Sequence, residues 1–149
     1  MPEPLYVLLA DDDADDRYFF DKALKAISVS SRLTTVVDGE QLMAYLLKNF
    51  TQLPDVLFLD LNMPRKNGSE CLCEIKSNKA LKDLPVIIYS TSLYSEMADL
   101  LHTNGAHYYI KKSGLAELES TLQTVLELIR GANFVRPTRD EFILKIVAQ

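Results

Sequence analysis

Short apolar blocks alternate with amphipathic stretches along the chain up to about residue 130. Residues 5–10 form an uninterrupted apolar block that stops at Asp11, which predicts a strand buried on both faces of a parallel sheet. Further short blocks, rich in apolar, aromatic or β-branched residues, lie at residues 33–37, 56–59, 86–90 and 107–111. The pattern therefore predicts five strands.

Apolar residues recur at helical spacing between these blocks. The last helix shows this most clearly, with polar residues opposite a stripe made of Leu115, Leu118, Leu122, Val125, Leu126 and Ile129. Similar stripes predict helices over about 14–28 and around residues 42–47, 71–75 and 97–101. Strict alternation of strand and helix predicts an α/β fold, a doubly wound parallel sheet with helices on both faces.

Length and charge argue against membrane-spanning and nucleic-acid-binding proteins. The chain has 149 residues and a formal net charge of −5, and its longest apolar run is residues 5–10. A bilayer crossing needs about 20 apolar residues, and no leader sequence opens the chain, so we expect one cytoplasmic domain without membrane contact. A pI near 5.0 and the lack of a Lys/Arg stripe argue against direct binding to nucleic acid.

Polar residues stand where the predicted strands end. Asp11 and Asp12 follow the first strand, Asp60 follows the third, Ser90 ends the fourth, and Lys112 follows the fifth. Ligands of such sheets bind outside the carboxyl ends of the strands. Crowded carboxylates favour a hard divalent cation such as Mg²⁺. A lysine opposite the metal would neutralise an incoming phosphoryl group, which Asp60 could accept as an acyl phosphate.

The rest of the acidic run has a simpler interpretation. Asp13, Asp15 and Asp16 are typical of a solvated helix start, where negative charge complements the helix dipole. The run is not an EF-hand loop, because the sixth and twelfth positions counted from Asp11 are Asp16 and Lys22 instead of Gly and Glu.

Four motifs in order resemble the receiver domain of two-component response regulators, the CheY-like family. They are Leu8-Leu-Ala-Asp-Asp-Asp13, Leu57-Phe-Leu-Asp-Leu-Asn-Met-Pro64 with Gly68, Ile88-Tyr-Ser-Thr91, and Gly105-Ala-His-Tyr-Tyr-Ile-Lys-Lys112. The resemblance covers about residues 5–130 and implies a flavodoxin-like sheet of order 2-1-3-4-5. It implies a phosphoacceptor, with only self-phosphorylation and autodephosphorylation chemistry, and not an enzyme with a separate substrate.

The resemblance also implies roles for individual residues. Asp60 would receive the phosphoryl group from a sensor histidine kinase, and Asp12 and Asp60 would bind Mg²⁺ directly. Asp11 would act largely through water, and the main-chain carbonyl of Asn62 would complete the protein ligands. Lys112 would pair with the phosphoryl group.

Further implied roles concern the switch and the lifetime of the phosphoryl group. Ser90 would move toward the phosphoryl group, and Tyr109 would change rotamer as the hydroxyl moves. Asn62 and Ser92 lie at positions that tune the hydrolysis of the aspartyl phosphate.

One departure from the family affects the lysine. The family usually has a cis proline directly after it, whereas this chain has Ser113. A cis bond before a residue other than proline costs about 2.5–4 kcal/mol, so we expect a trans peptide here and a slightly altered lysine. Lys111 competes for the role, but strand alternation places Lys112 on the side of Ile110 and favours it.

Residues 131–149 form a C-terminal extension too short for a DNA-binding output domain. Output is therefore expected through contact with a downstream protein or through phosphotransfer, as in single-domain receivers paired with separate kinases, including phytochrome-type kinases. A capping box at Thr138–Glu141 and the apolar stripe Phe142, Ile143, Ile146 and Val147 predict a short amphipathic helix. It would pack on its own domain or in a homodimer.

Two other functions remain open at this stage. A magnesium-dependent phosphohydrolase would need a carboxylate two residues after the nucleophile, where this chain has Asn62. A receiver-like interaction module that works without phosphorylation is the second alternative, and Ser113 motivates it.

Overall fold

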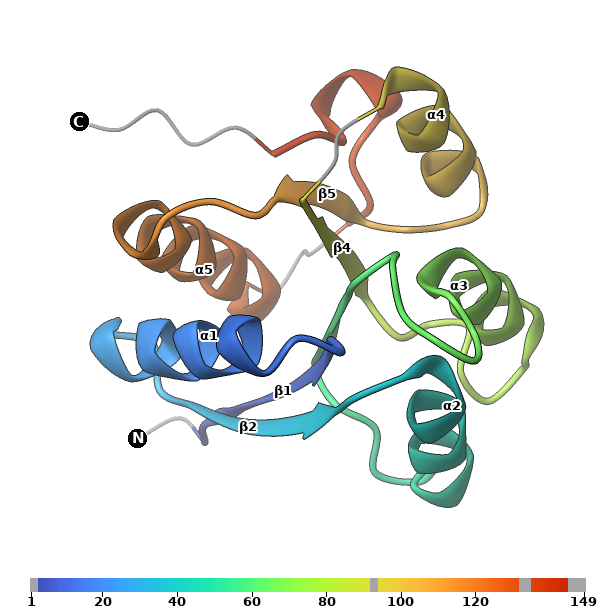
Figure 1. The fold of residues 1–149 in the computed structure, drawn as a ribbon, viewed down its shortest axis with the longest axis horizontal. Coiled ribbons are helices and arrows are strands. Elements are labelled where there is room, and N and C mark those ends of the chain that lie inside the picture. The colour runs from blue at the N-terminus through green and yellow to red at the C-terminus, as the bar shows by residue number, and fades with distance from the viewer. Residues whose placement is uncertain (1–2, 92–93, 132–134, 145–149) are drawn as a thin grey trace.

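Parallel strands and helices alternate in the computed structural model, which describes residues 3–91, 94–131 and 135–144 (Figure 1). The strands are β1 (Leu5–Ala10), β2 (Ser31–Val36), β3 (Val56–Leu59), β4 (Val86–Ser90) and β5 (Tyr108–Lys111). The helices are α1 (Ala14–Ala26), α2 (Gly39–Lys48), α3 (Gly68–Ser77), α4 (Ser95–Thr103) and α5 (Leu115–Arg130). The sheet has the order β2-β1-β3-β4-β5, which confirms the predicted fold class.

The sheet separates two apolar cores. Alternate residues of each strand point to opposite faces, so Leu8 joins the core under α2, α3 and α4, while Leu9 joins the core under α1 and α5. Figure 1 shows α1 and α5 together on one side of the sheet and α2 and α3 on the other. Burial of β1, β3 and β4 on both faces explains their nearly continuous apolar sequences.

Side-chain caps determine where several helices begin. Asp13 accepts hydrogen bonds from the backbone N–H groups of Asp15 and Asp16, which starts α1 directly after the first strand. Asn67 and Glu70 form a capping box at the start of α3. These caps satisfy N–H groups that have no partner inside the helix.

The strand register brings the ends of the strands to one edge. Ala10 pairs with Leu59, Leu59 with Ile88, and Ser90 with Lys111. The residues that follow these positions therefore meet at the carboxyl edge of the sheet, as expected for a parallel sheet.

The described part of the C-terminal extension differs from the prediction. Arg139–Glu141 form one turn of 3-10 helix, and Thr138 makes no side-chain cap. Ile143 then forms a parallel bridge with Tyr109 of β5. The predicted amphipathic helix is therefore wrong for residues 142–144, while Ile146 and Val147 lie outside the described residues. A short helix is marginal, and the free edge of β5 offers backbone partners that compete with it.

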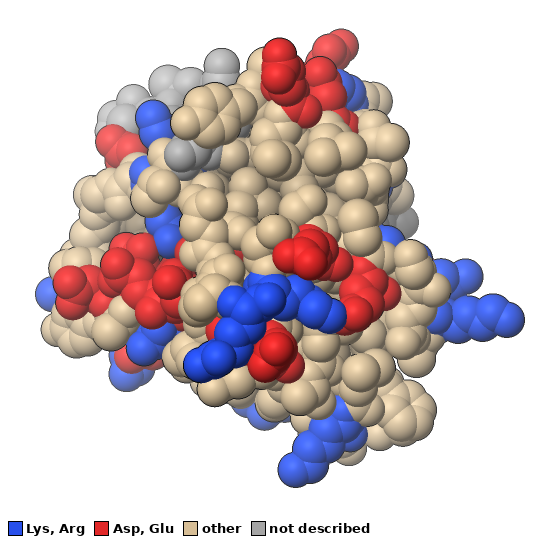
Figure 2. Space-filling model, turned by 45° about the vertical axis from the view of Figure 1, so that its right-hand side comes forward, with Lys and Arg blue, Asp and Glu red and all other residues tan. Residues whose placement is uncertain are grey.

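Opposite charges are interspersed on the surface. On the face drawn in Figure 2, lysine and arginine side chains lie beside aspartate and glutamate. Arg65 pairs with Asp38 at 3.1 Å and Lys66 pairs with Glu74 at 2.7 Å. Among the described residues, none of the helices has the length and apolar character needed to span a membrane.

Candidate functional site

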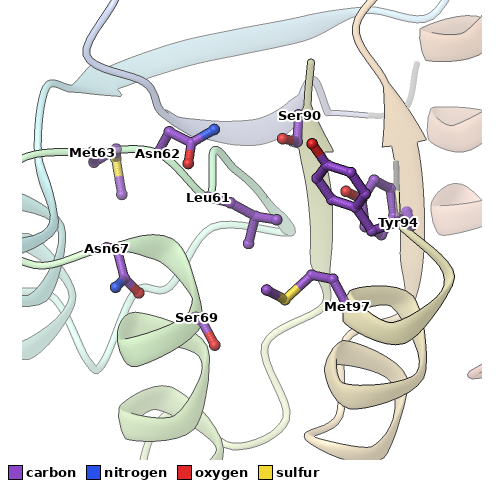
Figure 3. Close-up of a pocket in the computed structure, with 9 residues that line it drawn as sticks. Leu61, Asn62, Met63, Asn67, Ser69, Ser90, Tyr94 and Met97 are labelled. Carbon is purple, nitrogen blue, oxygen red and sulfur yellow. The ribbon is translucent and has the colours of Figure 1, made fainter. Parts of the chain in front are cut away.

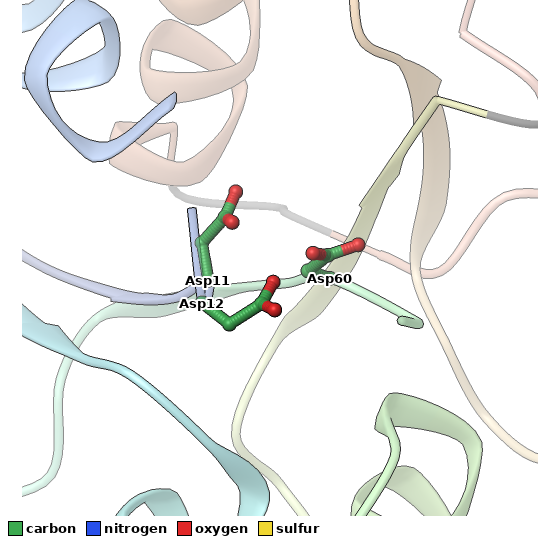
Figure 4. A group of neighbouring side chains, drawn as sticks. All are labelled: Asp11, Asp12 and Asp60. Carbon is green, nitrogen blue, oxygen red and sulfur yellow. The ribbon is translucent and has the colours of Figure 1, made fainter. Parts of the chain in front are cut away.

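Three carboxylates converge at the carboxyl edge of the sheet. Asp11 and Asp12 follow β1, and Asp60 follows β3, as Figure 4 shows. One carboxylate oxygen from each lies within 4.8 Å of the others. Asp11 and Asp60 are buried, whereas Asp12 is exposed, so the cluster is open on one side. This donor set suits a hard divalent cation that keeps some of its water.

Lys112 lies against these carboxylates. Its Nζ atom is 2.8 Å from an oxygen of Asp11, 2.8 Å from an oxygen of Asp16 and 3.5 Å from an oxygen of Asp60. The Lys112 side chain is only 8% exposed, whereas Lys111 points to solvent. Of the two candidate lysines, Lys112 is therefore the one that reaches the site.

Burial changes the proton affinity of this cluster. It raises the pKa of Asp60 from 3.8 to about 6, against the opposing charge of Lys112, and it also raises the pKa of Asp11. Burial alone would lower the pKa of Lys112, but its hydrogen bonds to Asp11 and Asp16 outweigh that effect and raise it. One ammonium group cannot neutralise all these carboxylates, so a bound divalent cation would relieve the remaining repulsion.

The loop after β3 holds Asp60 against the start of α3. The backbone N–H of Asn62 donates to the Asp60 carboxylate at 3.3 Å, and the N–H of Gly68 donates to the Leu61 carbonyl at 3.0 Å. A Cβ atom on Gly68 would lie 2.3 Å from the Asp60 carbonyl oxygen. Glycine at position 68 thus permits the close approach that sets this loop.

Ser90 and Tyr109 form the neighbouring part of the site. Both side chains are fully buried. Burial raises the pKa of Tyr109, and the nearby hydroxyl of Ser90 opposes that rise. The carbonyl of Ser90 accepts from the backbone N–H of Lys112 at 2.7 Å. A cavity of about 450 Å³ opens beside them (Figure 3), lined by Leu61, Asn62, Met63, Asn67, Ser69, Ser90, Tyr94, Met97 and Tyr109. Ser90 and Tyr109 therefore line the same cavity beside the acidic edge.

Two further predictions for the site concern the peptide bond after Lys112 and the position of Ser92. No cis peptide bond occurs among the described residues, so the bond between Lys112 and Ser113 is trans, as expected. Ser92 lies outside the described residues.

Asp16 lies in the site, although the sequence predicts a solvated helix start for it. Its carboxylate contacts Lys112 at 2.8 Å, and its side chain is only 32% exposed. A usable signal exists in the sequence, because Asp16 lies four residues before Phe20, which is fully buried. Positions i and i+4 share one helix face, so Asp16 lies on the face of α1 that is turned toward the sheet.

Comparisons with known proteins agree with this geometry. Residues 7–123 match the response regulator receiver domain. Response regulator Rcp1 of Synechocystis sp. is 31% identical over 129 residues, which cover 82% of this chain and 86% of Rcp1.

Solved structures give the same assignment. The crystal structure of the phosphorylated cyanobacterial phytochrome response regulator RcpA is 33% identical, with a TM-score of 0.76 and coverage of 85% of this chain and 94% of that chain. The Mn(2+)-bound form of Rcp1 is 28% identical, with a TM-score of 0.77 and coverage of 91% and 100%. With its sheet order, its acidic edge and these matches together, the chain belongs to the receiver domain family of two-component response regulators.

Proposed function

We propose that this receiver accepts a phosphoryl group on Asp60 from a sensor histidine kinase in a Mg²⁺-dependent reaction. The observation that carries the proposal is the position of Asp60, whose carboxylate is buried beside Asp11 and Asp12 and lies 3.5 Å from the Lys112 ammonium group. An acceptor in that position has a metal-binding edge on one side and a cation on the other. These are the two partners that a transferred phosphoryl group needs.

In this reaction a carboxylate oxygen of Asp60 attacks phosphorus, and the bond from phosphorus to the donor nitrogen breaks. The product is an acyl phosphate. Lys112 would pair with a phosphoryl oxygen, and the hydroxyl of Ser90 would donate a hydrogen bond to another.

The metal site would use residues of the same edge. Asp12, Asp60 and the main-chain carbonyl of Asn62 would hold Mg²⁺, and Asp11 would act through water. A bound divalent cation would offset the negative charge of carboxylate and phosphoryl oxygens as they approach. Rcp1, a similar chain, was solved in a Mn(2+)-bound form, which supports the binding of a divalent metal by this chain. Asn62 and Ser92 would tune the hydrolysis of the acyl phosphate.

The relatives support a class of upstream partner. RcpA is described as a cyanobacterial phytochrome response regulator and was crystallised in phosphorylated form. A phytochrome-type histidine kinase is therefore the donor we infer for this chain. Its output would be contact with a downstream protein or transfer of the phosphoryl group.

Intact mass spectrometry tests the proposal. Wild-type protein incubated with acetyl phosphate and Mg²⁺ should gain one labile phosphoryl group, and Asp60→Asn should gain none. EDTA should abolish the adduct in the wild type. Asp15→Asn is the matched control, because Asp15 is an exposed acidic residue of the same edge, and it should be modified like the wild type.

The opposite result would identify a different function. An unmodified wild-type chain, tested with acetyl phosphate and with histidine kinases, would contradict the phosphoacceptor role. It would favour the interaction module that works without phosphorylation, and partner binding unchanged in Asp60→Ala would then support that module. Turnover of a phosphate ester by the wild type alone would instead indicate a phosphohydrolase.

A further inference from the structure

The sheet fixes the backbone of Lys112 but not its ammonium group. The backbone N–H of Lys112 donates to the Ser90 carbonyl at 2.7 Å. The chain continues through Ser113 and Gly114, which are exposed, so no proline ring restricts the backbone after the lysine. A lysine side chain is long and flexible, and ordering it costs more conformational entropy than ordering most other side chains. Other residues must therefore determine where the Nζ atom lies.

Asp16 holds the ammonium group from helix α1. Its carboxylate accepts a hydrogen bond from Nζ of Lys112 at 2.8 Å. Asp16 lies in the first turn of α1, directly after the cap formed by Asp13, where the helix dipole stabilises a negative charge. Phe20 lies one turn later on the same face and is fully buried, which fixes this part of the helix against the sheet. Asp16 is therefore a well-anchored partner for the lysine.

Tyr89 lies on another side of the ammonium group. The Nζ atom of Lys112 is 5.2 Å from the centroid of the Tyr89 ring, within the distance at which an aromatic face attracts a cation. The Tyr89 side chain is buried, and its ring packs edge to face on Phe20 with the centroids 5.7 Å apart. Burial raises the pKa of Tyr89 to about 12, so the ring is neutral at pH 7. Phe20 thus supports both Asp16 and Tyr89.

Asp11 and Asp60 define the remaining surroundings of the ammonium group. One oxygen of Asp11 accepts from the backbone N–H of Asp13 at 3.0 Å, and the other lies 2.8 Å from Nζ of Lys112. The nearest oxygen of Asp60 is further away, at 3.5 Å, which is longer than an ordinary hydrogen bond. The side of the ammonium group that faces Asp60 is therefore the one left for a phosphoryl oxygen.

We propose that Asp16 and Tyr89 are positioning residues for Lys112. They hold its ammonium group toward Asp60 and thereby set the rate at which Asp60 is phosphorylated. The inference rests on the proposed function, because it concerns the transfer of a phosphoryl group to Asp60. Among the described residues, neither belongs to the carboxylate cluster that could hold a metal ion. Each therefore acts through Lys112 and not on the metal or the phosphorus atom.

Asp16 has two opposite effects on the transfer. Its negative charge weakens the attraction of the ammonium group for a phosphoryl group, whereas its hydrogen bond keeps the ammonium group in place. The Asp16 side chain is 32% exposed, so solvent screens its charge. A displacement of about 1 Å can slow a reaction by about 100-fold. Placement therefore outweighs charge, and loss of Asp16 should slow the transfer.

Chemical labelling of lysines tests the placement without any phosphoryl group. The full chain in EDTA is treated with a trace of acetic anhydride and then cleaved after glutamate. Residues 97–117 form a peptide whose only lysines are Lys111 and Lys112, and tandem mass spectrometry distinguishes the two. In the wild type Lys112 should react about ten times more slowly than Lys111, because its ammonium group is buried and hydrogen-bonded. In Asp16→Asn the Lys112 rate should rise by about threefold or more.

Two controls accompany the labelling. Asp15→Asn alters an exposed carboxylate in the same helical turn, and the rate at Lys112 should stay at the wild-type value. Lys76 is an internal reference for loosening of the whole fold, because its ammonium group donates to two backbone carbonyls at 2.9 and 2.8 Å, away from Asp16. Labelling of Lys76 should be the same in every variant.

Pairs of substitutions at each position identify the group responsible. Asp16→Glu restores a carboxylate, so it should recover part of the protection of Lys112 that Asp16→Asn loses. Tyr89→Leu removes the aromatic face and Tyr89→Phe keeps it, so Tyr89→Leu should lose more protection. Equal labelling of Lys112 in Asp16→Asn, Tyr89→Leu and the wild type would overturn the proposal.

Phosphorylation kinetics test the effect on rate. Intact mass spectrometry follows the adduct over time at several concentrations of acetyl phosphate with Mg²⁺. In Asp16→Asn and Tyr89→Leu the maximal rate should fall about tenfold or more, while the half-saturating concentration should change by less than about threefold. A purely structural role would not lower the maximal rate of chains that are still folded.

The outcomes separate this inference from the proposed function. A wild-type chain that forms no adduct would overturn both, because there would be no transfer for Lys112 to assist. A wild-type adduct with the same maximal rate in Asp16→Asn and Tyr89→Leu would overturn the positioning role alone. Faster labelling of Lys112 together with a lower maximal rate in both variants would support it.

Discussion

The acidic edge and the edge of β5 are held together by different forces. Around Lys112, ion pairs with the carboxylates of Asp11, Asp16 and Asp60 determine the arrangement, and the shortest of them are 2.8 Å. Around Phe142, a fully buried ring and two backbone hydrogen bonds at 3.0 Å hold residues 142–144 on the edge of β5. The first region should respond to metal ions and pH, and the second to the loss of apolar contact.

The comparison shows why a receiver can couple two such regions. Ion pairs in a partly dry site change strongly when one charge is added, whereas apolar contact changes only when a side chain moves. Tyr109 adjoins both, because it lines one cavity with Ser90 and its ring packs on Phe142. Among the described residues, Tyr109 therefore offers a route by which a charge placed at one end can alter apolar packing at the other.

The largest effect is expected from Lys112→Ala. It leaves the buried carboxylates of Asp11 and Asp60 without their cation, and breaking a buried pair in this way costs about 3–5 kcal/mol. Urea unfolding in EDTA should show that loss, and Mg²⁺ should restore a large part of it. Lys111→Ala, a change at an exposed lysine, should stay within about 0.5 kcal/mol. Equal losses in both variants would contradict the role of Lys112.

Phe142→Ala should cause the next largest loss of unfolding free energy, and Mg²⁺ should not change that loss. A Phe→Ala change in a closed core costs about 3–5 kcal/mol. Residues 136–144 can detach while the sheet stays folded, so we expect a smaller loss of unfolding free energy, about 2 kcal/mol. Urea unfolding with and without Mg²⁺ measures both points. Phe50→Ala is the control, because Phe50 is 54% exposed. Recovery of Phe142→Ala by Mg²⁺ would remove the distinction between the two regions.

Asp16→Asn should have a smaller effect within the acidic edge. It removes one ion pair of Lys112 while the pair with Asp11 remains, and one charge-assisted hydrogen bond at a partly exposed position is worth about 1 kcal/mol. The unfolding midpoint in EDTA should fall accordingly. Asp15→Asn alters a neighbouring exposed carboxylate and should leave the midpoint unchanged. A loss of the same size in Asp15→Asn would show that helix charge, not the contact with Lys112, is responsible.

Acidification should change stability in opposite directions through His107 and Asp60, with no effect of His107 at neutral pH. Burial, aided by the charges of Lys76 and Arg136, lowers the pKa of His107 from 6.5 to about 4. Its contribution to stability is complete above pH 6.5 and is lost as the pH falls through 4. The pKa of Asp60 is raised from 3.8 to about 6, so its contribution is complete below pH 3.8 and is lost as the pH rises through 6.

Two variants separate these contributions in metal-free buffer. Between pH 6.5 and 4, His107→Gln should lose less stability than the wild type, and Asp60→Asn should lose more. Urea midpoints at several pH values measure both slopes, and an NMR titration of the His107 ring checks its pKa directly. Slopes that do not change in either variant would show that these groups do not titrate differently on folding.

Most of the fold could be predicted because its signals are local. A continuous apolar block such as residues 5–10 predicts a buried strand, and the α5 stripe predicts its buried face. The candidate site was predictable for the same reason, since parallel strands bring Asp11, Asp60 and Lys112 to one edge wherever the chain runs between them.

The positions of Asp16, Phe142 and Ile143 depend on residues that lie far from them in the sequence. Asp16 looks like an ordinary helix-start carboxylate until α1 packs where its carboxylate meets Lys112, which lies 96 residues later. Phe142 and Ile143 have an amphipathic pattern that a helix or a strand could use. The free edge of β5 decided between them by supplying the N–H and C=O of Tyr109.

The sequence by itself therefore determined the strand and helix order, the two cores and the acidic edge. Hydrophobic periodicity and the residues at strand ends extend over only a few positions, so they can be recognised within a single segment of the chain. Only the tertiary structure decided that Asp16 binds the lysine and that residues 142–144 cover the edge of β5. Those contacts exist only after segments from distant parts of the chain have packed together, and no local pattern encodes which partner each will meet.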